Sequence, residues 1–227
     1  MKLYIDDAHI EDIKRLYDLY PIDGVTTNPS ILSKVNQDPI KTLVEIREEI
    51  GPESELFVQA VALDTEGILR DAHAIIDLLG KNTIIKVPAV PAGIKAIKAL
   101  TQEGIRTCGT VVYTALQAFL ASKAGAAYVA PYVNRIDNMG YDGIKDVKEI
   151  YDILQKSGWK TEVLAASFKN AWQVVVMAEY GIEAVTCAPN IIDAFATNPS
   201  IEGAIQDFVN DFRELTGKET MADAQQP

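Results

Sequence analysis

The chain has 227 residues, 48% of them hydrophobic, and a net charge of −11 at neutral pH. This length fits one globular domain with a substantial core, and the negative charge argues against a nucleic-acid or anionic-membrane partner. No run approaches the roughly 18 apolar residues of a membrane span, and the sequence opens on a strand-like stretch rather than a signal peptide. Cys108 and Cys187 lie in apolar runs and are typical of reduced core residues, so we expect a cytoplasmic protein.

Short apolar runs alternate with segments of helical periodicity along the chain. The predicted strands cover residues 2–6, 24–26, 56–61, 83–89, 106–112, 127–133, 161–166 and 184–188. The predicted helices cover residues 8–17, 40–50, 64–79, 91–103, 113–124, 141–156 and 170–180, with another after Asn28 and two more near 191–196 and 201–215. Asp38 followed by Pro39 predicts the capped start of the 40–50 helix.

Eight strand–helix units with short links predict a (β/α)₈ TIM barrel in one domain. A doubly wound open sheet is the alternative that the same alternation allows. We expect the barrel, with its C-terminal helices, to cover residues 1–215, and residues 216–227 to form a polar tail that another subunit could order.

Lys86 interrupts an apolar strand, Thr83-Ile84-Ile85-Lys86-Val87. Lysine is rarely fully buried without a reason. One reason is chemical, because burial disfavours the charged form of an amine and a neutral amine can form a Schiff base with a ketone or aldehyde. The alternative is a stem that packs while the ammonium reaches water or an ion pair.

Chemistry in a TIM barrel lies at the C-terminal ends of the strands. The polar residues expected to converge there with Lys86 are Asp6, Thr26, Asn28, Gln59, Thr110, Tyr132, Arg135 and Ser167. Ser167 and Arg135 together suggest an anion site.

Each of these residues also has a structural interpretation. Asp6 could cap the next helix, and Asn28 before a proline is a common turn former. Tyr132 could be an ordinary core aromatic residue, and Arg135 could form a surface ion pair with Asp137 or Asp142. Gln59 is harder to dismiss because a buried amide needs partners.

Other chemistries find little support in the sequence. The two histidines, His9 and His73, do not have metal-ligand spacing, and there is no P-loop, GxSxG or GxGxxG motif. We therefore expect an enzyme that works without a metal or redox cofactor.

Several motifs together resemble the small transaldolase-like family that includes the fructose-6-phosphate aldolases. They are Val25-Thr26-Thr27-Asn28-Pro29-Ser30, Ile85-Lys86-Val87-Pro88, Gly109-Thr110, Ala130-Pro131-Tyr132-Val133-Asn134-Arg135-Ile136-Asp137 and Ala165-Ala166-Ser167-Phe168-Lys169. The similarity runs in order from residue 1 to about residue 215.

The resemblance implies a (β/α)₈ barrel with a Schiff-base lysine at Lys86 and Asp6 assisting proton transfer. It implies that Thr26 and Asn28 line the sugar site and that Arg135 and Ser167 hold a phosphate. It also implies homo-oligomers, pentamer rings stacked into decamers, with the C-terminal helix packed on a neighbour.

The resemblance leaves two activities open. Transaldolases of this kind carry Glu on the third strand and Phe on the sixth, whereas this chain has Gln59 and Tyr132. That matches the aldolase pattern, in which Gln59, Thr110 and Tyr132 hold a water. The implied reaction is reversible cleavage of fructose 6-phosphate to dihydroxyacetone and glyceraldehyde 3-phosphate; the alternative is a transaldolase that transfers the dihydroxyacetone unit.

Cys108 departs from the aldolase pattern, which has an apolar leucine there. A non-catalytic sugar-phosphate-binding barrel is a third hypothesis.

Overall fold

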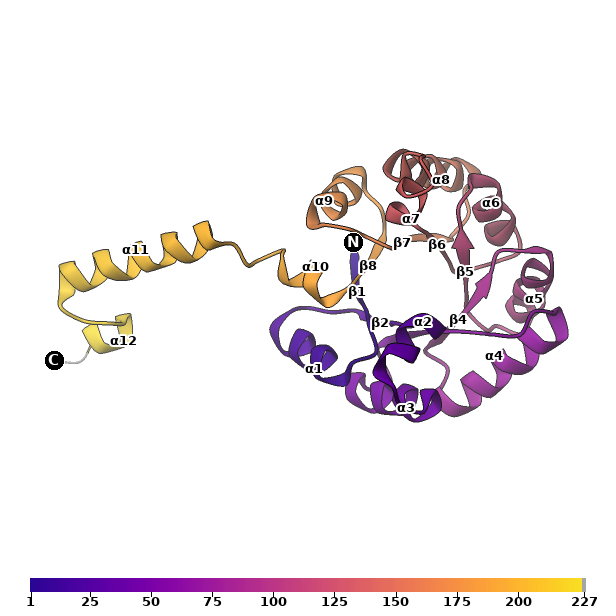
Figure 1. Cartoon of the computed structure of the whole chain (residues 1–227), viewed down its shortest axis with the longest axis horizontal. Helices are drawn as coiled ribbons and strands as arrows, with labels where there is room; N and C mark the ends of the chain where they lie inside the picture. Colours follow the sequence, from indigo (N-terminus) through magenta and orange to yellow (C-terminus); the bar gives the residue numbers. More distant parts are fainter. Residues whose placement is uncertain (226–227) are drawn as a thin grey trace. The chain divides into compact units, whose positions relative to one another are not determined.

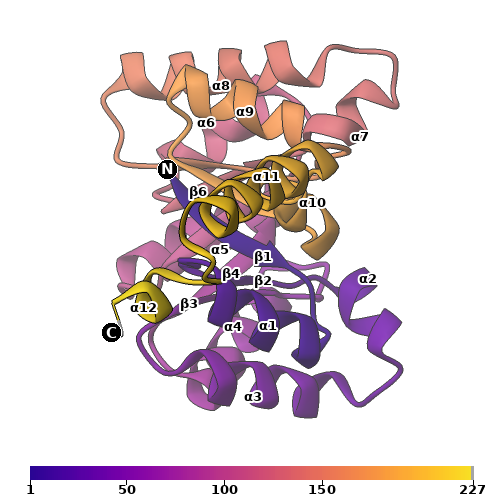
Figure 2. The same cartoon turned by 90° about the vertical axis from the view of Figure 1, so that its left-hand side faces the viewer.

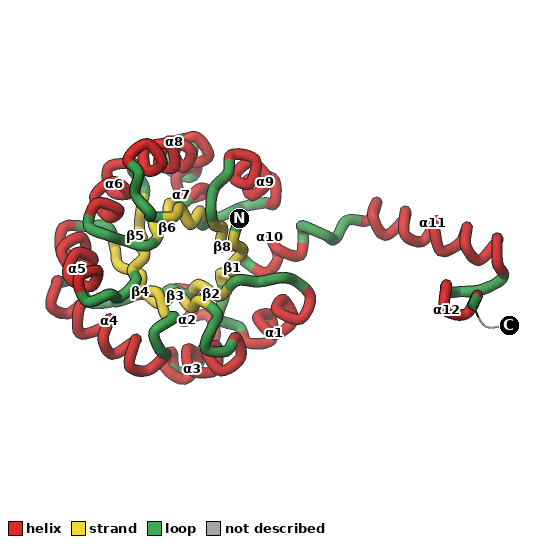
Figure 3. The backbone as a smooth tube through the Cα atoms, turned by 180° about the vertical axis from the view of Figure 1, so that it is seen from behind, coloured by secondary structure: helices red, strands yellow, loops and turns green. Residues whose placement is uncertain are grey.

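The structure is a computed structural model that describes residues 1–225. Eight parallel strands close into a barrel in chain order, visible as the central ring of Figure 3. They are β1 (Lys2–Asp6), β2 (Gly24–Thr26), β3 (Glu55–Gln59), β4 (Thr83–Pro88), β5 (Thr107–Val112), β6 (Tyr128–Pro131), β7 (Glu162–Ala165) and β8 (Ala184–Cys187). Because β8 pairs with β1, the (β/α)₈ prediction is confirmed and the open sheet is excluded.

Helices surround the strands (Figure 1). They are α1 (Ile10–Leu19), α2 (Pro29–Leu32), α3 (Pro39–Ile50), α4 (Thr65–Leu79), α5 (Pro91–Gln102), α6 (Ala115–Lys123), α7 (Val133–Asp137), α8 (Gly143–Ser157), α9 (Ala171–Tyr180) and α10 (Pro189–Asp193), with a 3₁₀ turn at Ser33–Val35. In the side view, α1, α3 and α4 lie on one side of the strands and α6, α8 and α9 on the other (Figure 2). Among the described residues, no helix is both long and apolar enough to cross a bilayer.

Local sequence explains several helix starts. The Asp38 carboxylate accepts a hydrogen bond from the Lys41 amide at 2.8 Å, so the predicted cap is confirmed. Gly93 allows the first turn of α5 to approach β4, because a Cβ at this position would lie 1.9 Å from the carbonyl oxygen of Pro88. That contact fixes the helix after β4 against the strand that carries Lys86.

A layer of side chains fills the barrel beneath its C-terminal mouth. Its members are buried and come from seven of the eight strands: Tyr4, Phe57, Ile84, Cys108, Tyr128, Ala130, Leu164 and Ala184. The Phe57 ring meets the Tyr4 and Tyr128 rings edge to face, with centroids 5.1 Å apart in each pair. Both cysteines are free and buried.

A polar network closes the N-terminal end of the barrel. Glu55 accepts hydrogen bonds from Tyr4, Tyr128 and Arg106, and Lys2 donates to Tyr128 at 2.7 Å. Burial alone would raise the pKa of Glu55, but these hydrogen bonds outweigh it and lower the pKa. The charge of Glu55 therefore stabilises the fold at neutral pH.

The strand and helix boundaries differ from the prediction most at β6. The sequence pattern predicts a strand to Val133, but β6 ends at Pro131 and Tyr132 forms one isolated bridge with Ala166. Helix α7, which the sequence did not predict, begins at Val133 and is buried through Val133 and Ile136. Strand β3 likewise ends at Gln59, two residues early.

The chain divides into two compact units, Met1–Ile191 and Ile192–Pro227. The first holds the barrel, and the second contains α11 (Pro199–Thr216) and α12 (Met221–Ala224). No residue of α11 is buried. The expected barrel domain through residue 215 and the polar tail of 216–227 remain predictions, and residues 226–227 of that tail lie outside the described part.

Candidate active site

Strand register brings the predicted polar residues together at the C-terminal mouth of the barrel. Lys86 pairs with Gln59 of β3 and Cys108 of β5, and Asp6 pairs with Thr26 of β2. A cavity of about 100 Å³ opens there. Its lining consists of Asp6, Thr26, Asn28, Lys86, Ala130, Tyr132, Arg135, Leu164, Ala166, Ser167 and Thr186. Seven of the nine predicted site residues are in this set, all except Gln59 and Thr110.

Lys86 is buried inside the barrel, with 5% of its surface exposed. Its position two residues beyond Ile84 places it on the inward face of β4, directly above the packed layer. The amine donates a 2.8 Å hydrogen bond to the carbonyl of Thr27 and lines the cavity. The alternative in which the amine reaches bulk water is therefore wrong, and the amine faces a space that a small carbonyl compound could enter.

Asp6 is the last residue of β1 and lines the same cavity as Lys86. It does not cap α1, because the N-cap of that helix is His9; instead it accepts a 2.7 Å hydrogen bond from the Thr26 hydroxyl. The barrel wall removes most of the hydration of the carboxylate and this desolvation raises the pKa of Asp6, although Lys86, the Thr26 hydrogen bond and Arg135 oppose the rise. A carboxyl group with a raised pKa beside an amine is suited to proton transfer.

Thr186 is a member of the site that sequence reasoning missed. Its hydroxyl on β8 lies 2.6 Å from that of Thr26. Because the single proton of Thr26 is donated to Asp6, Thr186 must donate to Thr26, which makes a directional chain from Thr186 to Asp6. The signal was present in the sequence, since Thr186 is a polar residue at the end of the apolar eighth strand.

Tyr132 forms the other wall of the site. Its hydroxyl lies 3.0 Å from that of Thr110, and the guanidinium of Arg135 lies over its ring at 4.4 Å from the centroid. The Tyr113 ring packs edge to face against it at 5.4 Å. Tyr132 therefore carries a hydroxyl pair at the mouth rather than being a core aromatic residue.

Arg135 and Ser167 both line the cavity. Arg135 is exposed on α7 and forms no ion pair within residues 1–225, so the predicted alternative of a surface pair with Asp137 or Asp142 does not occur there. Ser167 has a left-handed backbone, φ 63°, and its carbonyl accepts the Asn134 amide at 2.7 Å. A guanidinium and a hydroxyl that line one cavity suit a phosphate.

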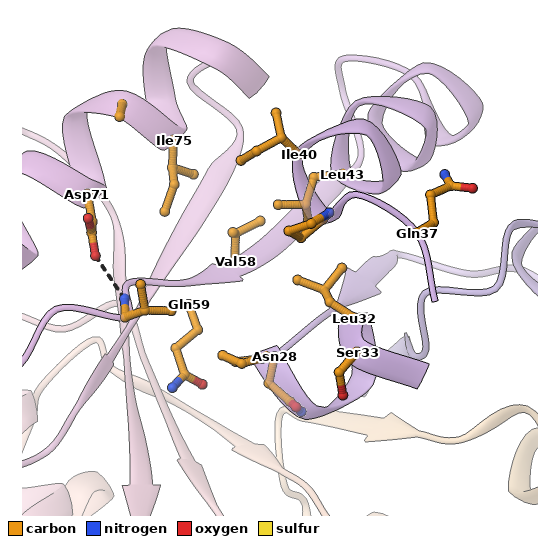
Figure 4. Close-up of a pocket in the computed structure, with 14 residues that line it drawn as sticks. Asn28, Leu32, Ser33, Gln37, Ile40, Leu43, Val58, Gln59, Asp71 and Ile75 are labelled. Carbon is orange, nitrogen blue, oxygen red and sulfur yellow. Dashed lines mark hydrogen bonds between the residues drawn. The ribbon is translucent and has the colours of Figure 1, made fainter. Parts of the chain in front are cut away.

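Asn28 lines both the cavity and a larger groove, whereas Gln59 lines only the groove. Asn28 caps α2 by accepting the Ile31 amide at 3.0 Å, so it is both a turn former and a cavity residue. Gln59 forms no hydrogen bond with Thr110 or Tyr132 among the described residues. Its side chain lines an apolar groove of about 520 Å³, whose lining also includes Leu32, Leu43, Val58 and Ile75 (Figure 4).

Cys108 belongs to the buried layer and is the register partner of Lys86 on β5. Burial raises the pKa of its thiol to about 12, with the charge of Lys86 opposing the rise, so the thiol stays protonated and acts as an apolar filler.

Within the described chain, no three His, Cys, Asp or Glu side chains are grouped as metal ligands. The chemistry that this site offers is that of an amine, a carboxyl group and a hydroxyl pair.

Fold and site thus define a TIM barrel with a buried lysine at its mouth. Residues 3–226 match the model of the Transaldolase/Fructose-6-phosphate aldolase family, and the chain belongs to that family. The chain is 39% identical over 215 residues to a probable transaldolase of Kosmotoga olearia, covering 94% of this chain and 97% of the relative.

A solved structure titled "Native KDPGal structure" is similar in fold, with a TM-score of 0.57 over 82% of this chain and 81% of that one. At 14% identity this likeness supports the barrel fold alone. The resemblance deduced from the motifs is confirmed at the level of the family.

Proposed function

We propose that the protein is a class I aldolase that cleaves fructose 6-phosphate reversibly to dihydroxyacetone and glyceraldehyde 3-phosphate through a Schiff base on Lys86. The observation that carries the proposal is the burial of Lys86, whose amine faces a small cavity beside Asp6. Membership of the family supports a sugar-phosphate substrate.

In the first half of the reaction, the nitrogen lone pair of the Lys86 amine attacks the C2 carbonyl of the ketose. Loss of water from the carbinolamine gives an iminium. Arg135 and Ser167 hold the phosphate in the cavity, while Thr26 and Asn28 contact the sugar hydroxyls. These contacts orient the C3–C4 bond so that its electrons can move into the adjacent iminium.

In the second half, a base takes the proton of the C4 hydroxyl and the C3–C4 bond electrons move to the iminium. Glyceraldehyde 3-phosphate leaves and an enamine remains on Lys86. We assign the proton transfers to a water held by Tyr132, Thr110 and Gln59, with Asp6 assisting. Protonation of the enamine at C3 and hydrolysis of the resulting imine release dihydroxyacetone and regenerate the amine.

The alternative is a transaldolase, in which the enamine survives until a second aldose accepts the dihydroxyacetone unit. The name of the Kosmotoga olearia relative favours this alternative. The hydroxyl pair of Thr110 and Tyr132, 3.0 Å apart at the mouth, favours the aldolase, because it can position the water that protonates and hydrolyses the enamine. A phenylalanine at position 132 would leave no such pair.

An acceptor-free cleavage assay distinguishes the two activities. Purified protein is incubated with fructose 6-phosphate alone, and free dihydroxyacetone and glyceraldehyde 3-phosphate are measured. The aldolase releases both in equal amounts. A transaldolase releases at most one equivalent of glyceraldehyde 3-phosphate per site, and further turnover then requires an added aldose such as erythrose 4-phosphate.

A non-catalytic sugar-phosphate-binding barrel is the third possibility. Borohydride added with substrate would leave no adduct on such a protein. A pyridoxal-phosphate enzyme, which also uses a barrel lysine, would absorb visible light, whereas we expect a colourless protein.

We also propose that the protein is a cytoplasmic homo-oligomer, a pentamer or decamer. Helix α11 carries exposed apolar side chains spaced so that they share one face: Ile201, Ile205, Phe208 and Leu215. A second copy would bury this face, and the apolar groove of Figure 4 is a surface of matching character. Light scattering tests this, because Phe208→Glu should lower the molar mass of the assembly.

A further inference from the structure

Two strands end in a backbone conformation that is costly for their residues. Val111 at the end of β5 has φ 58° and Ser167 just after β7 has φ 63°. This left-handed region is unfavourable for residues other than glycine and especially for a β-branched side chain such as that of Val111. Something in each loop must therefore hold the backbone in place.

The same arrangement follows both residues. Three residues on, a polar side chain caps the next helix, Thr114 for α6 and Asn170 for α9. A glutamine, Gln117 or Gln173, lies six residues after the left-handed residue. Its backbone N–H donates a hydrogen bond to the capping side chain, at 3.3 Å for Gln117 and 3.1 Å for Gln173.

The side chain of each glutamine also reaches back into the loop. Gln117 Oε1 accepts the Tyr113 amide at 3.0 Å, and Gln173 Oε1 accepts the Lys169 amide at 2.7 Å. In both cases the donor is two residues beyond the left-handed residue. The arrangement is a variant of the capping box that extends one residue further from the helix.

The Nε2 groups of the two glutamines make different contacts. Gln117 donates to Val111 O at 3.1 Å and to Ala89 O at 3.2 Å, which joins the ends of β5 and β4. Ala89 in turn donates to Thr110 O at 2.8 Å. Gln117 therefore ties together the loop that follows Lys86, the strand end that carries Thr110, and Tyr113, whose ring packs on Tyr132.

Gln173 makes its contacts next to α7 and the loop that contains Ser167. It is buried, and its Nε2 donates to the carboxylate of Asp137 at 2.9 Å at the end of α7, the helix that carries Arg135. The loop and α7 are also joined by the bond from the Asn134 amide to Ser167 O. Gln173 thus links the two groups proposed to hold the phosphate.

We propose that Gln117 and Gln173 are positioning residues with separate roles. Gln117 fixes the position of the Thr110–Tyr132 hydroxyl pair used for proton transfer, and Gln173 fixes the positions of Ser167 and Arg135 in the anion site. Neither side chain lines the cavity. The assignment of duties depends on the proposed function, whereas the clamping of the two loops does not.

Kinetics of two alanine variants test the separation. Gln117→Ala should lower kcat about 10- to 100-fold and leave unchanged the KM ratio between phosphorylated and unphosphorylated substrates. Gln173→Ala should raise KM for the phosphorylated substrate about tenfold with little change in kcat. Gln155→Ala is the matched control, since Gln155 is an exposed helix glutamine bonded to Glu183, and it should change neither parameter.

A rescue variant separates positioning from simple loss of folding. Glycine adopts the left-handed conformation without strain, so Val111→Gly combined with Gln117→Ala should recover a large part of kcat. Active sites are counted by borohydride trapping at Lys86, so that unfolded protein does not enter kcat. Equal effects of both alanine variants on kcat and KM, or no effect of either, would overturn the proposal.

Hydrogen exchange gives a readout that does not need activity. In Gln117→Ala the Tyr113 amide should exchange at least tenfold faster while the Lys169 amide is unchanged, and Gln173→Ala should show the reverse. If the wild-type protein proves inactive, the proposed function fails while this exchange pattern still supports the clamps. Unchanged exchange at both amides would show that the glutamines hold neither loop.

Discussion

The hydroxyl groups of Thr110 and Tyr132 lie 3.0 Å apart across two neighbouring strand ends of the barrel. This pair is the feature that the aldolase assignment depends on, because it can orient a water above the enamine on Lys86. A phenyl ring in place of the phenol removes the partner of Thr110 and leaves the ring contact with Arg135 in place.

Tyr132→Phe should therefore lower acceptor-free cleavage of fructose 6-phosphate about 100-fold, a typical value for a lost general acid–base group. Transfer of the dihydroxyacetone unit to an added aldose should persist. Both rates are measured on one preparation, with Tyr141→Phe, an exposed tyrosine, as control. An equal fall in the two rates would mean that a residue other than Tyr132 determines whether the protein acts as an aldolase or a transaldolase.

Arg135→Ala should act on the phosphate rather than on the chemistry. A charge-assisted hydrogen bond contributes about 1.5–3 kcal/mol, so KM for fructose 6-phosphate should rise about 10- to 100-fold while KM for free dihydroxyacetone in the reverse direction stays constant. Arg70→Ala, a change in α4, is the control. If both substrates are affected to the same degree, the phosphate binds elsewhere.

The Thr26 hydrogen bond should control the pH dependence through Asp6. Desolvation raises the pKa of Asp6, and the bond from Thr26 favours its charged form and opposes the rise. Thr26→Val removes that bond, so the pKa of Asp6 should rise further and the acid limb of the kcat profile should move to higher pH. Lys86, Arg135, Asp7 and Cys187, the other groups that face Asp6, are unchanged in the variant.

Thr26→Ser provides the comparison, because serine keeps the donor and should restore the original limb. An acid limb that stays at the same pH in Thr26→Val would mean that Asp6 does not govern it.

Glu55→Gln tests the polar network at the closed end of the barrel. The folded-state pKa of Glu55 is lowered, so its carboxylate adds stability above its unfolded-state pKa, and this stability is lost as the pH falls through the folded-state value. The variant should lose about 1–3 kcal/mol at pH 7, measured by urea unfolding. The difference from wild type should shrink under acid conditions; a difference that does not depend on pH would contradict the role given to the charge.

The sequence was sufficient to predict the barrel and to identify most of the polar residues that line the candidate site. The predicted strands placed Lys86, Asp6 and Thr26 at or near strand ends, and parallel register brings these ends to one mouth. Seven of the nine predicted residues line one cavity, because the rule that barrel chemistry lies at strand ends depends on topology alone.

The parts that the sequence did not predict depend on tertiary contacts. Val129, Ala130 and Val133 are apolar, so the pattern extends β6 past Pro131; in the structure the chain turns at Tyr132 and begins α7, where Val133 and Ile136 are buried. The left-handed Val111 has no local signal, since valine disfavours that conformation and a contact from Gln117, six residues on, holds it. Propensity describes neighbours in sequence, and these features come from neighbours in space.

Covalent trapping on Lys86 tests the central claim most directly. Protein is incubated with fructose 6-phosphate or dihydroxyacetone, reduced with borohydride, digested, and analysed by mass spectrometry, with Lys86→Met as the control. We predict a reduced dihydroxyacetone adduct on the peptide that contains Lys86 and none in the variant, which should also lose carbon–carbon cleavage. Cleavage that continues while Lys86 stays unmodified, or in Lys86→Met, would contradict the account.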